Sequence, residues 1–138
     1  MFIKKWLLLS GMALAIATGH AQDTSTGETL HAVIGADGTQ RIRMVGGNYF
    51  FKPKHIVVKV NTPVEISISK EAGIVPHTFV LKVPAWGVAT DTELDTEART
   101  IAFTPTTVGK HPFHCRNKLL FFKSHQERGM EGVIEVIP

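Results

Sequence analysis

The chain contains only one cysteine, Cys115, among its 138 residues. A single thiol cannot form an internal disulfide, so this is not a small domain held together by cross-links. A free thiol is also a liability wherever disulfides form, unless something occupies it. Coordination of a metal ion is one such use, which makes the surroundings of Cys115 the first place to search for a functional site.

Long apolar runs are also missing. The apolar stretch 6–17 has about a dozen residues, whereas a membrane-spanning helix needs ~20. Two lysines precede this stretch and small residues at positions 19–21 follow it, which is the pattern of an export signal. We expect residues 1–21 to be a signal peptide that is cleaved after Ala21, and the mature chain to be a soluble protein of the periplasm. An uncleaved N-terminal anchor is the alternative.

The excess of positive charge is small in the expected mature chain. Removing residues 1–21 takes away two lysines, so Lys+Arg falls from 15 to 13 against 12 Asp+Glu, and the formal net charge falls from +3 to +1. The basic residues are scattered and form no dense patch, which gives no support for nucleic-acid binding. A Ser-His-Asp arrangement and a glycine-rich phosphate loop are also absent, so neither chemistry is indicated.

The remaining pattern is one of short apolar strands separated by turn residues, with no long amphipathic helix. Alternation is clearest in 64–69, where three β-branched residues face one way and polar residues face the other. We therefore expect one all-β domain over residues 22–138, a Greek-key antiparallel β-sandwich. Residues 84–97 could hold a short helix or an extended excursion. The expected strands are 30–34, 41–45, 49–51, 55–60, 64–69, 77–83, 99–104, 109–114 and 132–137.

Four side chains of the right chemistry for a metal site stand at the ends of these strands. Cys115, His125 and Met130 follow one another in the C-terminal segment, and His77 begins the apolar run 77–83. A thiolate, two imidazoles and a thioether are the ligands of a blue-copper electron-transfer centre, with a weak bond to the methionine. The sequence therefore predicts a site for one copper ion that alternates between Cu(II) and Cu(I).

Other residues near these positions are weaker candidates. His114 adjoins Cys115 but points to the opposite face of the strand. His111 lies four residues back, roughly 13 Å along an extended chain. Glu71 and Glu131 are alternative oxygen ligands. The thiol and the thioether also have a plainer role, as buried core side chains.

Three segments together resemble the cupredoxins, the plastocyanin and azurin group. They are Pro76-His77-Thr78-Phe79, the strand 109–115 that ends in cysteine, and the closing segment 125–136. The resemblance extends from about residue 44 to the end of the chain. It implies a β-sandwich that carries electrons through one copper ion, and by position it places the family's ligands on His77, Cys115, His125 and Met130.

The chain departs from the common cupredoxin pattern in two ways. Most members have Asn after the first ligand histidine and Ser or Thr after the cysteine, and these two residues brace the loops around the metal. Here they are Thr78 and Arg116, so the brace must differ. The segment between Cys115 and His125 is also longer than in familiar members, and residues 118–123 within it are strongly apolar.

The apolar residues 119–122 of this loop have two interpretations. They could fold back over the end of the sandwich as a cap. Alternatively, they form a hydrophobic patch near His125, flanked by Lys118 and Lys123, against which a redox partner protein docks. Both interpretations can hold at once. We expect the protein to be a monomer.

Three classes of function are compatible with a copper site. The first, which we favour, is a one-electron carrier between redox enzymes. The second is a copper chaperone or copper-resistance protein; such proteins often carry Met-rich or His-rich tails, and residues 22–43 contain only His31. The third is a copper enzyme, which would need a second, open metal site that the sequence does not provide. We therefore do not expect an enzyme.

Overall fold

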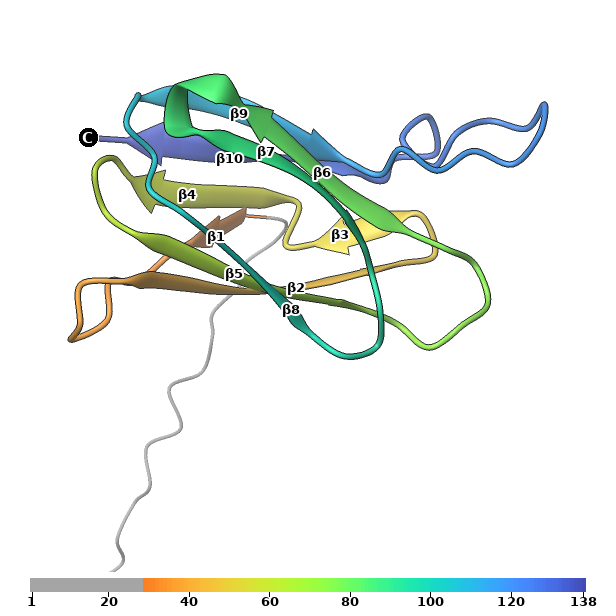
Figure 1. Cartoon of the computed structure of the whole chain (residues 1–138), viewed down its shortest axis with the longest axis horizontal. Coiled ribbons are helices and arrows are strands. Elements are labelled where there is room, and N and C mark those ends of the chain that lie inside the picture. Colours follow the sequence, from red (N-terminus) through yellow and green to blue (C-terminus); the bar gives the residue numbers. More distant parts are fainter. Residues whose placement is uncertain (1–28) are drawn as a thin grey trace, which may run out of the picture.

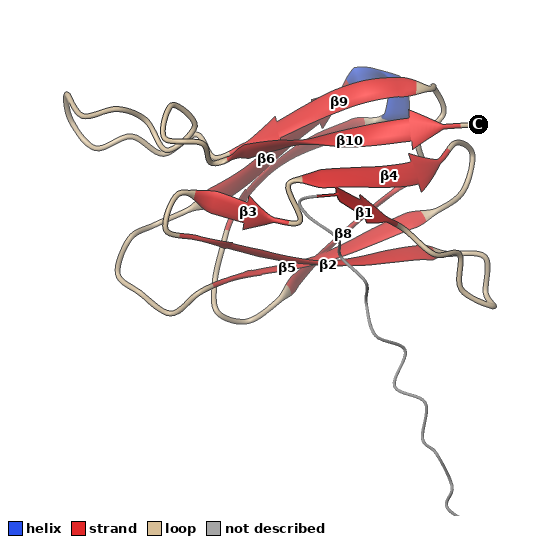
Figure 2. Cartoon of the chain, turned by 180° about the vertical axis from the view of Figure 1, so that it is seen from behind, coloured by secondary structure: helices blue, strands red, loops and turns tan. Residues whose placement is uncertain are grey.

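A computed structural model describes residues 29–138, and the expected signal peptide lies outside this range. The described chain forms two packed β-sheets (Figures 1 and 2). The larger sheet contains, in order, β1 (Thr29–His31), β4 (His55–Lys59), β10 (Glu131–Ile137), β9 (Gly109–His114), β6 (Thr78–Val83) and β7 (Val88–Glu93). The smaller sheet contains β3 (Phe50–Lys52), β2 (Gln40–Gly47), β5 (Val64–Lys70) and β8 (Arg99–Phe103). A short 3-10 turn, η1, covers Pro84–Trp86.

The two sheets enclose one apolar core, because each inner strand presents alternate side chains to the opposite sheet. Val64, Ile66 and Ile68 of β5 are all buried, as the alternation predicts. Three phenylalanine rings meet near one end of this core, with ring centres 5.2–5.9 Å apart. They are Phe51 from the smaller sheet, and Phe79 and Phe113 from the larger sheet.

The prediction of an all-β sandwich is confirmed, but the sheets are mixed and not wholly antiparallel. The pairs β1 with β4, β4 with β10, and β2 with β5 are parallel. Parallel neighbours arise here because the chain crosses to the other sheet between them and returns from the same end. The first strand is also shorter than expected, since β1 ends at His31 and Ile34 makes only an isolated bridge with Gln40.

The segment 84–97 contains both features that the sequence left open. After η1 the chain forms β7, which pairs antiparallel with β6 along its whole length. The strand escaped prediction because it lies at the edge of the sheet and buries only Val88 fully, so its sequence carries no apolar alternation.

The topology brings three chain segments to one end of the sandwich. His77 stands directly before β6, Cys115 directly after β9, and the loop 116–130 leads from β9 to β10. Because β9 pairs antiparallel with both β6 and β10, the end of β9 lies beside the starts of the other two strands. None of the helical turns in residues 29–138 has the length and apolarity that a membrane crossing requires.

Candidate metal centre

His77, Cys115 and His125 come together at this end of the sandwich. Their ligand atoms all lie within 4.8 Å of one another. The two Nδ1 atoms are 3.1 Å apart, and Nδ1 of His125 is 3.5 Å from the sulfur of Cys115. Two ligands of one ion, each about 2.0 Å from it, are separated by roughly 3.3–3.6 Å. His125 therefore lies at about the spacing of a neighbouring ligand from both His77 and Cys115, and all three donor atoms are close enough together to hold one metal ion with small shifts.

The three side chains are buried, and this burial lowers the pKa of both histidines. The exposed fractions of His77, Cys115 and His125 are 3%, 0% and 6%. Burial lowers the pKa of His77 to about 4, with smaller contributions from the positive charges that His125 and Lys70 can carry. Burial and the nearby Arg128 also lower the pKa of His125. Both imidazoles are therefore neutral near pH 7, which is the form that binds a metal ion.

A hydrogen-bonded brace holds the two loops that carry His77 and Cys115. The hydroxyl of Thr78 donates to Oδ1 of Asn117 at 2.9 Å and accepts from the backbone N–H of Arg116 at 3.1 Å. The backbone N–H of Thr78 points at the sulfur of Cys115 at 3.3 Å, and the thiol of Cys115 donates to Asn117 Oδ1 at 3.3 Å. The brace thus uses Thr78, which the sequence analysis placed at this position, and Asn117, which it did not single out.

Backbone hydrogen bonds fix the positions of the other loop residues at the site. The N–H of Cys115 donates to the carbonyl of Met130 at 3.0 Å, and the N–H of Met130 donates to the carbonyl of His125 at 3.0 Å. The N–H of His125 in turn donates to the carbonyl of Asn117 at 2.9 Å. Outside this ring of bonds, Arg116 pairs with Asp91 on β7 at 2.8 Å. The positions of the sulfur and of His125 are therefore set by the fold.

Met130 is completely buried, and its backbone bonds directly to Cys115 and His125. Its methyl carbon lies 3.2 Å from the place that a Cβ would occupy on Gly46, at the end of β2. The same position is 2.9 Å from Leu94 and 3.3 Å from Phe51, so a larger residue at 46 would push on Met130. The absence of a side chain at Gly46 makes room for the thioether.

Tyr49 was missed by the sequence analysis, although it contacts both histidines. Its ring meets His125 edge-on with centres 4.9 Å apart, and it meets His77 in the same way at 6.3 Å. The guanidinium of Arg128 lies over the ring of Tyr49, 4.6 Å from the ring centre. Tyr49 adopts a left-handed backbone conformation (φ 66°) that no sequence pattern indicated.

The weaker candidates lie outside the group of three. Within residues 29–138, no carboxylate joins it. Glu71 packs against Gly47, with Oε2 3.1 Å from the place of a Cβ there, and Glu131 accepts a hydrogen bond from Gln126. His111 packs against Trp86 with ring centres 4.2 Å apart. His114 belongs to the face of β9 opposite to Phe113 and Cys115, as strand geometry predicts.

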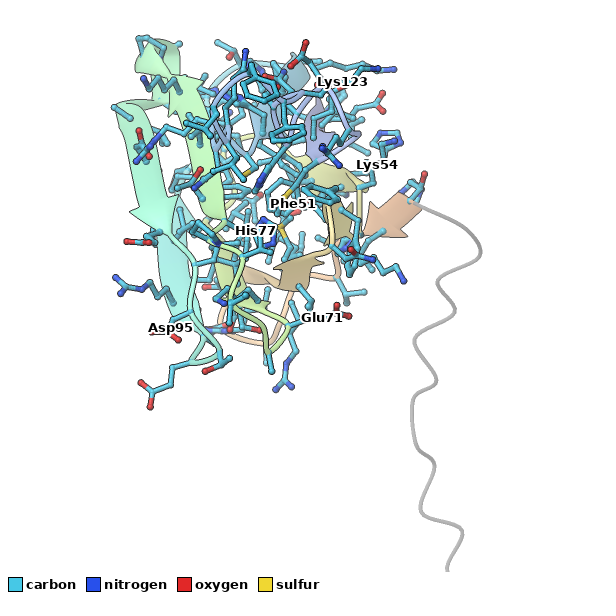
Figure 3. All side chains as sticks on the ribbon, turned by 90° about the vertical axis from the view of Figure 1, so that its right-hand side faces the viewer. Phe51, Lys54, Glu71, His77, Asp95 and Lys123 are labelled. Atoms are coloured by element: carbon cyan, nitrogen blue, oxygen red, sulfur yellow. The ribbon has the colours of Figure 1, made fainter. Side chains whose placement is uncertain are left out.

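The apolar residues 119–122 do not cap the sandwich. They are 47–84% exposed, and Figure 1 shows the loop between β9 and β10 reaching past the ends of both sheets. A hollow of about 400 Å³ lies between this loop and the segment 74–76. Figure 3 looks at this end of the molecule, with His77 near the centre and Lys123 toward the tip of the loop. The hollow is lined by Tyr49, Ile74, Val75, Pro76, Asn117, Lys118, Leu119, Phe122, Lys123, His125 and Arg128.

Comparison with known proteins identifies the fold but no sequence family. The sequence matches no protein-family model and no curated protein. Solved structures do match. The metal-binding domain of the Cu(I)-exporting P-type ATPase CopA from Streptococcus pneumoniae D39, solved with Cu(I), is 21% identical over 80% of this chain and 96% of that domain, with a TM-score of 0.59.

Two further structures share the architecture at lower identity. Dithionite-reduced auracyanin from Roseiflexus castenholzii is 19% identical over 75% of this chain and all of that protein, with a TM-score of 0.54. The copper protein rusticyanin is 15% identical over 81% of this chain and 84% of that protein, with a TM-score of 0.55. The chain therefore has a cupredoxin-like fold, and the expectation from the sequence resemblance is confirmed at that level.

Proposed function

We propose that the chain is a type 1 (blue) copper protein in which His77, Cys115 and His125 hold one copper ion and Met130 supplies a fourth, weaker ligand. The observation that carries this proposal is the buried convergence of two neutral imidazoles and the only thiol of the sequence within 4.8 Å. The donor set fits copper, because thiolate and thioether favour Cu(I) and imidazole serves both oxidation states.

We propose one-electron transfer as the role of this site. Copper, when bound, supplies the Cu(II)/Cu(I) couple. The chain's own contribution is rigidity: the sulfur of Cys115 and the ring of His125 are held by the Thr78–Asn117 brace and by backbone hydrogen bonds. Ligands that the fold holds in place move little when the charge of the ion changes, and outer hydrogen bonds orient them. This favours fast electron exchange over catalysis on a substrate.

The hollow beside His125 supports a docking site for a redox partner protein. Its wall combines the apolar side chains of Ile74, Leu119 and Phe122 with the cations Lys118 and Lys123. A complementary partner would place an apolar side chain in the hollow and acidic residues around it. Docking there would bring the partner within a short distance of His125. The proposed setting is the periplasm, with the protein acting as an exported monomer.

The absorption spectrum tests the copper site. With Cu(II) added, the protein should absorb intensely in the visible range through thiolate-to-copper charge transfer, and Cys115→Ser should abolish this absorption. His114→Gln serves as the matched control, because this neighbouring imidazole lies on the other face of the strand and the colour should persist. Equal copper binding without colour in both the wild type and Cys115→Ser would contradict the ligand assignment.

A copper-handling role is the competing function, since the similar CopA domain belongs to a Cu(I)-exporting ATPase. Voltammetry of the loaded protein separates the two. A carrier gives a reversible one-electron wave and retains its copper in the presence of a Cu(I) chelator of moderate strength. A chaperone releases Cu(I) to the chelator and gives no stable wave.

A further inference from the structure

The tip of the loop between β9 and β10 carries the most unusual surface of the molecule. The N–H of Phe122 donates to the carbonyl of Leu119 at 3.0 Å, so residues 119–122 form a closed turn. Its two central residues, Leu120 and Phe121, are 75% and 84% exposed. Leu120 also has a left-handed backbone (φ 47°), a conformation usually taken by Gly, Asn or Asp. These two apolar side chains are not buried in the core, so packing of the fold does not explain why they stand at this place.

The loop has two sides with different surroundings. Leu119 and Phe122 face the hollow beside His125, whereas Leu120 and Phe121 do not line it. The ring of Phe121 stacks on that of Phe122 with centres 4.7 Å apart, so a partner protein seated in the hollow would contact Phe122 directly and need not cover Leu120 and Phe121. Figure 1 shows that the loop between β9 and β10 projects beyond the ends of both sheets. We call Leu120 and Phe121 the tip.

We propose that the tip inserts into the interfacial layer of an anionic membrane. A convex, apolar turn needs a matching pocket on a protein partner, but a bilayer accepts it without one, which favours the membrane. Two apolar side chains at the summit of a turn can bury themselves at the boundary between headgroups and acyl chains. The turn's own hydrogen bond between Phe122 and Leu119 removes one backbone pair from the cost of entering that layer.

The charges around the tip agree with a negatively charged surface. Lys118 and Lys123 flank the turn in the sequence, and Arg128 also lines the hollow. Glu127, the acidic residue closest in sequence, accepts a hydrogen bond from the N–H of Ser124 at 2.6 Å and offsets one of these three positive charges. Lysine side chains are long enough to keep their ammonium groups among lipid phosphates while the tip is buried. Membrane contact would thus be peripheral. It would be driven by burial of the two apolar side chains and by attraction between the lysines and the anionic lipids.

Vesicle co-sedimentation tests this proposal independently of copper. The protein is purified after export and its N-terminus is read by mass spectrometry, so that all variants share the same start. Vesicles of phosphatidylcholine mixed with phosphatidylglycerol are compared with vesicles of phosphatidylcholine alone. Wild type should bind the anionic vesicles more tightly. Leu120→Ser with Phe121→Ser should lower binding on the order of 30- to 100-fold, and Lys118→Gln with Lys123→Gln on the order of 10- to 30-fold.

A matched double variant controls for the loss of exposed apolar surface. Val33→Ser with Val108→Ser removes two apolar side chains that are 80% and 58% exposed and lie outside the 116–130 loop, and it should bind vesicles as the wild type does. Phe121→Trp should show a blue-shifted emission on adding anionic vesicles, and Val108→Trp should not.

Three results would overturn the proposal. The first is equal vesicle binding by the wild type and the tip variant, with urea unfolding showing both to be folded. The second is no preference of the wild type for anionic vesicles. The third is an absence of vesicle binding together with slower electron exchange between the tip variant and a protein oxidant in solution, which would assign the tip to protein docking. A colourless copper complex would defeat the proposed function but leave the vesicle result unaffected.

Discussion

Replacing Thr78 by valine would test the brace that holds the candidate metal centre together. The hydroxyl of Thr78 donates to Asn117 Oδ1 at 2.9 Å and accepts from the N–H of Arg116 at 3.1 Å. Thr78 is only 2% exposed. Valine has almost the same shape as threonine but no hydroxyl, so the substitution removes both hydrogen bonds without leaving a cavity.

The expected cost follows from the two groups that lose a hydrogen bond with Thr78. The N–H of Arg116 loses its acceptor, and Oδ1 of Asn117 keeps only the Cys115 thiol at 3.3 Å. A buried donor or acceptor without a hydrogen bond costs about 1–3 kcal/mol. Water can reach the half-buried Asn117, which lowers its share, so Thr78→Val should reduce the free energy of unfolding by about 2–3 kcal/mol in total. Thr78→Ser keeps the hydroxyl and loses one methyl group, which should cost about 0.8 kcal/mol.

Urea unfolding of the copper-free protein measures the difference, because bound metal would otherwise add its own stabilisation. With a slope of about 1.5 kcal/mol/M, the midpoint of Thr78→Val should fall by roughly 1–2 M, against about 0.5 M for Thr78→Ser. Equal midpoints for the two variants would refute the reasoning, since losing the hydroxyl and its two hydrogen bonds would then cost no more than losing one methyl group.

Three further predictions concern neighbouring residues. Burial holds the pKa of His77 at about 4, below its ordinary 6.5, so the unfolded chain binds the proton more tightly. The unfolding free energy of the copper-free protein should therefore fall as the pH drops from 6.5 to 4, by at most about 1.4 kcal/mol per pH unit. His77→Gln should reduce this dependence of the unfolding free energy on pH. A stability that rises on acidification would contradict the prediction. Gly46→Ala should cost about 1–3 kcal/mol in urea unfolding, because its Cβ would lie 2.9 Å from the buried side chain of Leu94. Gly47→Ala should cost less, because its Cβ would lie 3.1 Å from the exposed Glu71. Met130→Leu should keep the visible absorption of the copper form but shift its redox potential, because the axial ligand tunes the potential; an unchanged potential in voltammetry would exclude Met130 as a ligand.

The sequence was sufficient for the class of fold and for the residues that converge. Alternation in segments such as 64–69 depends on the period of a strand, which is a local property of the chain, and the structure follows it. Residue chemistry also singled out His77, Cys115 and His125, which the structure brings together, whereas Met130 as a ligand stays a prediction. The sequence did not predict β7 as a strand, because its mostly polar residues show no apolar alternation. The strand forms through its pairing with β6.

Tertiary structure decided what depends on contacts between distant segments. The sequence could show that the cupredoxin-type brace was missing, but the pairing of Thr78 with Asn117 across 39 positions follows from the register of β6 against β9. The approach of Tyr49 to His125 depends on a left-handed backbone that no periodic pattern encodes. The choice between a cap and a projecting turn for residues 119–122 likewise required the path of the loop, because an apolar residue has the same sequence signature whether the chain buries it or exposes it.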